Sequence, residues 1–346
     1  KNNIRNDNAL NNLRKDITYS NSAKSITGKY AIKILENLTG RMGLIRRAQG
    51  YQQCSSYKNS FFQAMVQQYG VSMEITSGSL QNIPKVGPII LVANHPFGIL
   101  DGLMMGFILS EVRASFKIMA HQVFGKSTEL NEHIIPISFD GTSAAVDLNI
   151  ASRKGAVTFL KSGGAIGIFP GGTVSTSKTL FSEPLDPIWR SFTARMISKS
   201  EATVIPIYFE GHNSRLFQLA SHLNYNLRMA LLMKEFKNRI DRPIKISVGR
   251  PIGYQELKKY IQDYKLLINT TPLGQYPYIN FSPDIPYQLL SSEHYCIDLI
   301  YNPKKTIFLK KAERQNSKTI NGLDMLISQA EAAWEIWLKM IEVHNV

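Results

Sequence analysis

Between residues 68 and 252 the sequence alternates short apolar runs with stretches of helical periodicity, and this alternation leaves few folds open to the chain. Short runs rich in Val, Ile and Phe are typical of strands, whereas apolar residues three and four positions apart indicate helices. Strands that alternate with helices form an α/β fold, with a central, mostly parallel or mixed sheet flanked by helices. The predicted strands are Val71–Ile75, Pro88–Ala93, Phe116–Ala120, His133–Ser138, Ala165–Phe169, Thr203–Phe209 and Ile244–Val248.

Three helices are predicted between these strands. Phe97–Ser110 has apolar residues at helical spacing and follows the second strand. Ser143 is the predicted N-cap of a helix that ends near Gly163. Asp186 and Pro187 are typical of an N-cap and a first helical position, which predicts a third helix with a buried stripe. That stripe would consist of Trp189, Phe192 and Met196.

The composition predicts four segments. Residues 1–21, rich in Asn, Lys and Asp, are expected to be a flexible N-terminus. Residues 22–60 are predicted to be a basic amphipathic helical segment, 61–253 the α/β domain, and 254–346 a mainly helical C-terminal extension. The extension ends in a long predicted helix, Thr319–Val343, whose tryptophans are more typical of packing or docking than of a ligand site.

The charge of the chain indicates an acidic partner. Lys and Arg number 40 and Asp and Glu 26, so the net charge is +14. Nucleic acid, anionic lipid, a phosphorylated cofactor and an acidic carrier protein all fit such a charge. The basic residues lie in amphipathic segments without a nucleic-acid-binding motif, so we expect no nucleic acid as a partner. The two cysteines exclude a disulfide scaffold and an all-cysteine zinc site.

The segment 22–60 has two interpretations. Its apolar residues recur every four positions, at Ile26, Tyr30, Ile34 and Leu38. Basic residues lie among and after them, at Lys24, Lys29, Lys33, Arg41, Arg46 and Arg47. The segment either packs on the α/β domain or lies on an anionic bilayer. No uninterrupted run of about 20 apolar residues, the length of a membrane span, is apparent. We therefore expect a protein that is soluble or lies on a membrane surface.

A histidine and an aspartate lie where a predicted strand turns into a predicted helix. His95 follows the strand Pro88–Ala93, and Asp101 lies six residues further on. In α/β folds the carboxyl ends of strands are where sites form. A His–Asp pair there is typical of a general base with an orienting carboxylate. The alternative is a structural histidine that caps the turn.

Three further segments carry polar residues at strand ends. The turn Phe169–Ser175 has glycines and hydroxyl groups, and its N–H groups can hold a phosphate or an oxyanion, although ordinary turn chemistry also explains it. The strand Val204–Ile207 leads into a polar cluster with His212 and Arg215. The last strand ends in Gly249–Ile252.

In order and spacing these four segments resemble the motifs of the PlsC-type lysophospholipid acyltransferase family. The family motifs are N-H-x-x-x-x-D, F-P-E-G-T-R-S, V-I-P-V and a late G-x-P-I. The sequence looks most like the hemolysin-like and ornithine-lipid O-acyltransferase branch, which carries N-H-P-F-G-x-x-D-G. The corresponding segments here are Asn94–Gly102, Phe169–Ser175, Val204–Ile207 and Gly249–Ile252. The resemblance covers about residues 30–252 and implies an acyltransferase-like α/β fold.

The sequence departs from the family pattern at several positions. The common spacing places the aspartate where this sequence has Leu100, one residue before Asp101. Gly171 takes the position of the family's Glu, and Val174 takes that of its Arg. The stretch 135–140 also lacks the arginine that the wider family carries before its second motif.

The resemblance implies a peripheral membrane O-acyltransferase of lipid biosynthesis on the cytoplasmic face of the inner membrane. It would move a fatty acyl chain from acyl-CoA or acyl carrier protein to the hydroxyl of a lysolipid, without a metal or redox cofactor. His95 would take the hydroxyl proton, and Asp101 would orient His95. The implied substrate-binding residues are Asn94, Gly98, Phe169, Pro170, Gly171, Gly172, Thr173 and Ser175. Further candidate anion contacts, or ordinary salt-bridge partners, are Lys178, Arg190 and Arg215.

The missing arginines predict a weak phosphate site. We therefore expect an acceptor without a phosphate, such as a lyso-ornithine or other lyso-amino-acid lipid, with lysophosphatidic acid as the alternative. A lipid-binding protein with impaired catalysis on the same fold is the alternative function. Water in place of the acceptor would give slow thioesterase activity.

Overall fold

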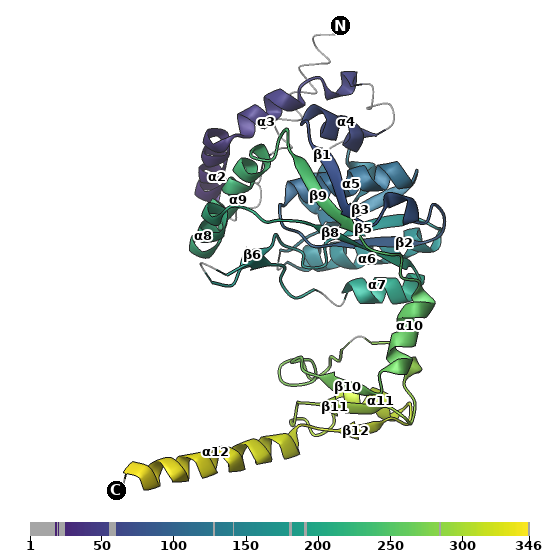
Figure 1. The fold of residues 1–346 in the computed structure, drawn as a ribbon, viewed down its shortest axis with the longest axis vertical. Helices are drawn as coiled ribbons and strands as arrows, with labels where there is room; N and C mark the ends of the chain where they lie inside the picture. The colour runs from purple at the N-terminus through teal and green to yellow at the C-terminus, as the bar shows by residue number, and fades with distance from the viewer. Residues whose placement is uncertain are drawn as a thin grey trace. The chain divides into compact units, whose positions relative to one another are not determined.

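The computed structural model describes residues 18, 20, 25–54, 60–126, 129–140, 142–179, 182–189, 192–283 and 285–344 (Figure 1). The chain divides into two compact units, residues 1–252 and 253–346. The division falls next to the end of the predicted α/β domain. Most of the predicted flexible segment 1–21 lies outside the described residues.

A seven-stranded mixed sheet forms the centre of the first unit, in the order β1-β9-β8-β2-β5-β3-β4. Neighbouring strands are parallel except for β8 and β9. The predicted α/β fold is therefore confirmed, and the predicted strands correspond to the strands of this sheet. They are β1 Ser72–Ser77, β2 Ile89–Ala93, β3 Phe116–His121, β4 Ile134–Ile137, β5 Ala165–Ile168, β8 Thr203–Phe209 and β9 Pro243–Val248. A separate antiparallel pair consists of β6 Thr176–Ser177 and β7 Pro184–Leu185.

The central strands were predictable because helices cover both of their faces. Every residue of β2 and β5 is buried, and buried parallel strands are continuous apolar runs in sequence. Figure 1 shows α5 on one side of the sheet and α6 with α7 on the other. The main hydrophobic core lies between the sheet and α4, α5 and α9. The helices of this unit are α2 Ile26–Thr39, α3 Arg41–Ala48, α4 Phe61–Gln68, α5 Ile99–Val112, α6 Ser143–Lys161, α7 Phe192–Ser200, α8 Arg215–Leu223 and α9 Tyr225–Lys237. Short 3-10 turns lie at Tyr51–Gln53, Leu80–Asn82, Gln122–Lys126 and Asn131–His133.

Two predicted helix starts were wrong. The N-cap of α6 is Thr142, whose hydroxyl accepts the Ala145 N–H at 3.2 Å, and Ser143 is the first helical residue. Asp186 does not cap a helix, because residues 186–189 are irregular and α7 begins at Phe192. The carboxylate of Asp186 is engaged elsewhere, with the turn that carries His95.

The basic N-terminal segment forms two helices, and the apolar row of the first helix is exposed. Gly40, with φ of 140°, ends α2 and separates it from α3. The buried residues of α2 are Gly28, Ile32 and Glu36, and Ile32 packs on Ala230 of α9. The apolar row predicted from the sequence lies on the opposite face of α2 and is exposed. That row consists of Ile26, Tyr30, Ile34 and Leu38.

The second unit contains a small parallel sheet beside its helices. Its strands run in chain order, β10-β11-β12. The buried carboxylate of Asp298 on β11 accepts hydrogen bonds from Asn269 Nδ2 at 3.0 Å and Thr306 Oγ1 at 2.5 Å, which joins β10 to the start of α11. The sequence predicted a mainly helical extension and did not predict this sheet, which lies beside the helices of the unit. The elements are α10 Tyr254–Asp263, β10 Leu266–Asn269, a 3-10 turn Tyr287–Leu289, β11 Tyr295–Asp298, α11 Ile307–Glu313, β12 Lys318–Ile320 and α12 Leu323–His344.

Among the residues that the structure describes, none of the helices is both long enough and apolar enough to cross a membrane.

Candidate active site

The turn that carries His95 is fixed to the sheet by its neighbour Asn94. The side chain of Asn94 accepts the Phe209 N–H at 2.8 Å and donates to the Phe209 carbonyl at 2.9 Å. An amide placed in this way continues the pairing of β2 with β8 by one residue beyond Ala93. Gly98, with φ of 91°, then turns the chain into α5, a conformation that favours glycine. His95 is therefore held between a strand end and a helix start.

His95 and Asp101 are adjacent in space. Nδ1 of His95 lies 2.9 Å from Oδ2 of Asp101, although the ring N–H is not aligned as in a linear hydrogen bond. Catalytic contacts are often poorly aligned before substrate binds. Asp101 is fully buried, and its Oδ2 accepts the N–H groups of Phe97 at 2.8 Å and Gly98 at 2.9 Å. The turn Pro96–Gly98 thus accommodates the extra residue between the histidine and the aspartate.

The second turn packs directly against His95. The imidazole stacks on the Phe169 ring with centroids 4.4 Å apart, and Ser175 donates its N–H to the His95 carbonyl at 2.8 Å. Gly171 is buried, Gly172 is half-buried, and Thr173 is exposed. The structure therefore brings together the two motifs that lie about 70 residues apart in sequence, as is general at the carboxyl edge of a parallel sheet.

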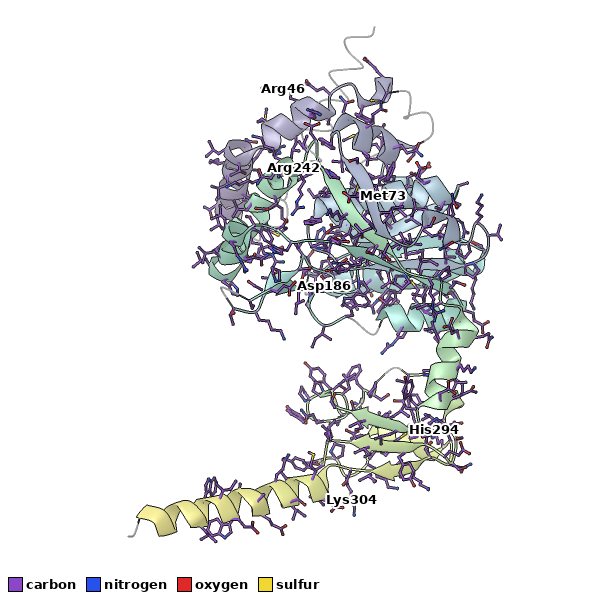
Figure 2. The ribbon with its side chains drawn as sticks, viewed as in Figure 1. Arg46, Met73, Asp186, Arg242, His294 and Lys304 are labelled. Carbon is purple, nitrogen blue, oxygen red and sulfur yellow. The ribbon has the colours of Figure 1, made fainter. Side chains whose placement is uncertain are left out.

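Sequence reasoning missed the residue that joins these two turns. Asp186 lies in the irregular stretch after β7 (Figure 2). Its Oδ1 accepts the His95 N–H at 3.0 Å and the Ser175 hydroxyl at 2.5 Å, and its Oδ2 accepts Trp189 Nε1 at 3.1 Å. In the sequence, Asp186 is followed by Pro187. This pair is typical of a helix N-cap, so it predicted the start of a helix and not a contact with His95.

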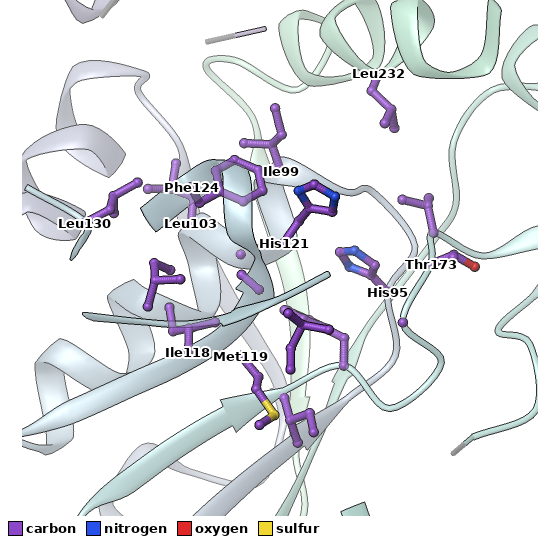
Figure 3. A pocket seen from close by; sticks show the side chains of 18 of the residues that line it. His95, Ile99, Leu103, Ile118, Met119, His121, Phe124, Leu130, Thr173 and Leu232 are labelled. Carbon is purple, nitrogen blue, oxygen red and sulfur yellow. The ribbon is translucent and has the colours of Figure 1, made fainter. Parts of the chain in front are cut away.

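A cavity of about 400 Å³ opens beside His95, Phe169 and Thr173. Figure 3 shows the imidazoles of His95 and His121 at this cavity. Most of the remaining wall is apolar, and small-molecule sites are commonly apolar cavities with a few polar groups. Apolar residues of the wall include Ile99, Leu103, Ile118, Met119, Phe124 and Leu130. The cavity suits a hydrocarbon chain whose reactive end lies at His95.

Two of the three predicted cationic contacts, Lys178 and Arg215, are not among the described residues that line this cavity. Lys178 is exposed, and Arg215 donates Nη1 to the Ser182 carbonyl at 3.0 Å, which ties α8 to the loop after β6. Arg190 lies outside the described residues. The described residues of the cavity wall include two other arginines, Arg153 of α6 and Arg228 of α9. Neither arginine belongs to a sequence motif, because each reaches the cavity only through the packing of its helix.

A third arginine lies next to the turn that carries His95. The Arg239 guanidinium lies 3.9 Å from the centroid of the Phe97 ring, and its Nη2 donates to the His212 carbonyl at 2.9 Å. Burial lowers the pKa of Arg239 from its usual value, and the nearby Glu235 and Asp101 carboxylates oppose that shift. Among the described residues, no group of His, Cys, Asp and Glu side chains is arranged to hold a metal ion.

Comparisons with known proteins give two different likenesses for two parts of the chain. A family model described as acyltransferase matches residues 53–263. Curated relatives match mainly the C-terminal part and are named shikimate dehydrogenase (NADP(+)). The protein from Methanococcus maripaludis strain C7 is 37% identical over 119 residues, which are 34% of this chain and 40% of that protein. The protein from Methanococcus vannielii is 32% identical over 43% of this chain and 45% of its own length. The chain thus spans less than half the length of these relatives.

Solved structures give the same two likenesses at low similarity. The PlsC 1-acyl-sn-glycerophosphate acyltransferase of Thermotoga maritima is 16% identical and covers 70% of this chain and 81% of its own, with a TM-score of 0.36. A chorismate mutase/shikimate 5-dehydrogenase fusion protein of Clostridium acetobutylicum is 32% identical over 32% of this chain and 42% of its own, with a TM-score of 0.21. Scores this low support no inference about function.

Proposed function

Because the chain belongs to the acyltransferase family, we propose that it transfers a fatty acyl group from a thioester to the hydroxyl of a lysolipid. The thioester would be acyl-CoA or acyl carrier protein. The observation that carries this proposal is the contact of 2.9 Å between His95 and the buried Asp101, at the wall of an apolar cavity of about 400 Å³. A base at the end of an apolar cavity fits a reaction whose substrates combine a hydroxyl or thioester with a long hydrocarbon chain.

In this mechanism Nε2 of His95 takes the proton of the acceptor hydroxyl as its oxygen attacks the thioester carbonyl. Asp101, next to Nδ1, selects the tautomer with a free Nε2 and stabilises the imidazolium that forms. The tetrahedral intermediate then breaks its C–S bond. The leaving thiolate takes the proton back from the imidazolium, so His95 is neutral again.

The turn after Phe169 is the candidate site for the oxyanion. Phe169 stacks on the imidazole of His95, and Ser175 binds the His95 carbonyl, so the turn has a fixed position relative to the base. Backbone N–H groups in such a position stabilise negative charge without reorganisation. Gly172 and Thr173 line the cavity at this point.

Acyl transfer is tested with purified full-length protein, a panel of acyl donors and lysolipids, and mass spectrometry of the products. His95→Ala should lower kcat about 10²–10⁴-fold, which is the usual contribution of a positioned base. The matched control is His222→Ala on α8, because His222 is not among the cavity residues. Full transfer activity in folded His95→Ala protein would overturn the mechanism. Lipid binding without any turnover would favour the lipid-binding alternative.

We also propose that the first unit docks on an anionic bilayer through α2 and α8. The residues Ile26, Tyr30, Ile34 and Leu38 are each more than half exposed. On α8 a second row, Leu216, Leu219 and Leu223, is between 44% and 69% exposed. Both helices pack against α9, and Figure 1 shows them on the same side of the unit. Exposed apolar rows beside basic residues are typical of helices that lie in a membrane interface.

Charge should contribute to this docking. Lys29 and Lys33 are exposed on α2, and each basic residue near an anionic surface contributes about 1 kcal/mol. Co-sedimentation with liposomes should therefore rise with the fraction of anionic lipid and fall with salt. A double variant, Ile34→Asp with Leu38→Asp, should lose binding, whereas Val86→Asp should keep it, since Val86 is an exposed apolar residue outside both helices. Liposome binding that is independent of lipid charge and unchanged in the Ile34→Asp, Leu38→Asp double variant would contradict this proposal.

The dehydrogenase likeness of the C-terminal part is not extended to an activity. A dinucleotide site on a parallel sheet uses a G-x-G-x-x-G turn to approach the pyrophosphate. The sequence contains no G-x-G-x-x-G, and the glycines after residue 252 are Gly253, Gly274 and Gly322. The residues of the proposed acyl-transfer site lie in the first unit.

A further inference from the structure

The sequence lacks the Glu and the Arg of the family motif F-P-E-G-T-R-S. Both side chains have counterparts on other elements of the first unit. Gly171 and Val174 stand where the acyltransferase motif F-P-E-G-T-R-S has a carboxylate and a guanidinium. In the structure a carboxylate, Asp186, lies beside Gly171, and a guanidinium, Arg228, binds the main chain of Val174. Both groups come from segments that a motif comparison does not align with this turn.

Pro187 and Asp186 lie next to the place where a side chain at position 171 would begin. A Cβ on Gly171 would lie 3.1 Å from Cδ of Pro187 and 3.4 Å from Oδ2 of Asp186. Through its Oδ1, Asp186 receives the N–H of His95 and the hydroxyl of Ser175. The carboxylate at this turn is therefore a positioning group that fixes the base relative to the turn.

Arg228 restores positive charge to the same turn. Its Nη2 donates to the carbonyl of Val174 at 2.7 Å, and its guanidinium lies 5.6 Å from the centroid of the Phe217 ring. The side chain of Val174 is buried together with Phe217 and Leu232. Arg228, which comes from α9, therefore lies next to a cluster of apolar side chains. Arg228 is half-buried and lines the same cavity as His95.

We propose that Arg228 binds an oxyanion of the acceptor's head group, either a phosphate or a carboxylate. This inference rests on the proposed function. A guanidinium has five N–H donors in a planar fork that fits two oxygens of one anion. The half-buried position reduces screening by water and strengthens the contact with an anion. The anion site is therefore not weakened by the loss of the motif arginine, as the sequence alone predicts, but supplied by α9.

Three acceptors separate the possible sources of the anion. Lysophosphatidic acid carries a phosphate, a lyso-ornithine lipid carries a carboxylate, and monoacylglycerol carries neither. Loss of a charge-assisted contact lowers affinity about ten- to a hundred-fold. Arg228→Gln should therefore raise KM for at least one of the two anionic acceptors by about that factor and leave KM for monoacylglycerol within about twofold. The acceptor with the larger rise identifies the anion.

Matched variants separate binding from structural support. Arg228→Lys should give an intermediate KM, because it keeps the charge and loses the planar fork. Arg242→Gln, at an exposed arginine just before β9, should leave all values unchanged. A purely structural role for Arg228 would lower kcat and raise KM for all three acceptors alike. That result, or an unchanged KM for both anionic acceptors, would overturn the inference.

A binding measurement makes this test independent of turnover. Calorimetric titration with each anionic lysolipid below its micellar concentration should show a Kd about ten- to a hundred-fold higher for Arg228→Gln than for wild type. If the wild-type protein binds these lipids through Arg228 but transfers no acyl group, the proposed function fails and the anion site stands. If transfer occurs and Arg228→Gln changes neither Kd nor KM, the anion site fails and the proposed function stands.

Discussion

Replacing Asp101 with Asn tests the catalytic arrangement with the smallest change in shape. Asp101 Oδ2 lies 2.9 Å from His95 Nδ1 and accepts the N–H groups of Phe97 and Gly98. The amide oxygen of Asn can take over these contacts as a neutral acceptor. The amide nitrogen would then occupy the place of Oδ1, which is buried without a hydrogen-bond partner among the described residues.

The expected loss of stability follows from these contacts. A hydrogen bond to a charged acceptor contributes about 1.5–3 kcal/mol and one to a neutral acceptor about 0.5–1.5 kcal/mol, a difference of about 1 kcal/mol for each N–H. The two backbone bonds therefore lose about 2 kcal/mol, and the amide N–H groups without partners add to this. For a unit of this size 1 kcal/mol shifts Tm by about 2–4 °C. We expect Tm of Asp101→Asn to fall by at least about 4 °C, with the fold retained.

The expected loss of activity is much larger. Without a carboxylate beside Nδ1, the imidazolium formed during proton transfer is no longer stabilised, and kcat should fall about 10²–10⁴-fold. Thermal unfolding reports the folded fraction, and thiol release from acyl-CoA with saturating lysolipid reports kcat well below Tm. Asp147→Asn, on the exposed face of α6, is the matched control and should change neither quantity. A folded Asp101→Asn protein with kcat within threefold of wild type would refute the role of the carboxylate.

Two further predictions concern packing and thiol reactivity. Gly106→Ala should lower the free energy of unfolding by about 1–3 kcal/mol in denaturant titrations, because its Cβ would lie 2.2 Å from the Phe62 ring; an unchanged unfolding midpoint would show that Phe62 moves aside at no cost. Burial raises the pKa of the Cys296 thiol, so less thiolate is present at neutral pH, and a disulfide reagent should modify Cys54 first and Cys296 only on unfolding. Equal rates for the two thiols in folded protein would contradict this order.

The parts of the fold that could be predicted are those whose signal is local. The strands of the large sheet are apolar runs because helices cover both faces, and His95 with Asp101 lies within one strand-to-helix turn. The sheet of the second unit gives no comparable pattern, because β10 and β11 have four residues each and β12 has three.

The parts of the site that could not be predicted depend on contacts between distant segments. Arg228 reaches Val174, 54 positions earlier in the chain, only because α9 packs beside the turn. The local sequence of Asp186 is typical of a helix cap. Its actual role, as the acceptor of hydrogen bonds from His95 and Ser175, depends on contacts that form only in the folded chain. The exposed row on α2 was visible as an amphipathic pattern, but periodicity does not tell which face meets the domain.

The close approach of Gly171 to Asp186 and Pro187 has an evolutionary consequence. A side chain at position 171 would crowd the present course of residues 186–187, because its Cβ would lie 3.1 Å from Pro187 and the loop would have to shift slightly. A carboxylate at position 171 would therefore lie close to the one at 186, so a chain that gains the first is expected to lose or move the second. Among related sequences the two positions should covary, with an acidic residue at 171 accompanied by a displaced or shortened loop at 186. If the carboxylate is supplied by position 186 in some related proteins and by position 171 in others, all of them keep a negative charge at this turn although their motifs differ.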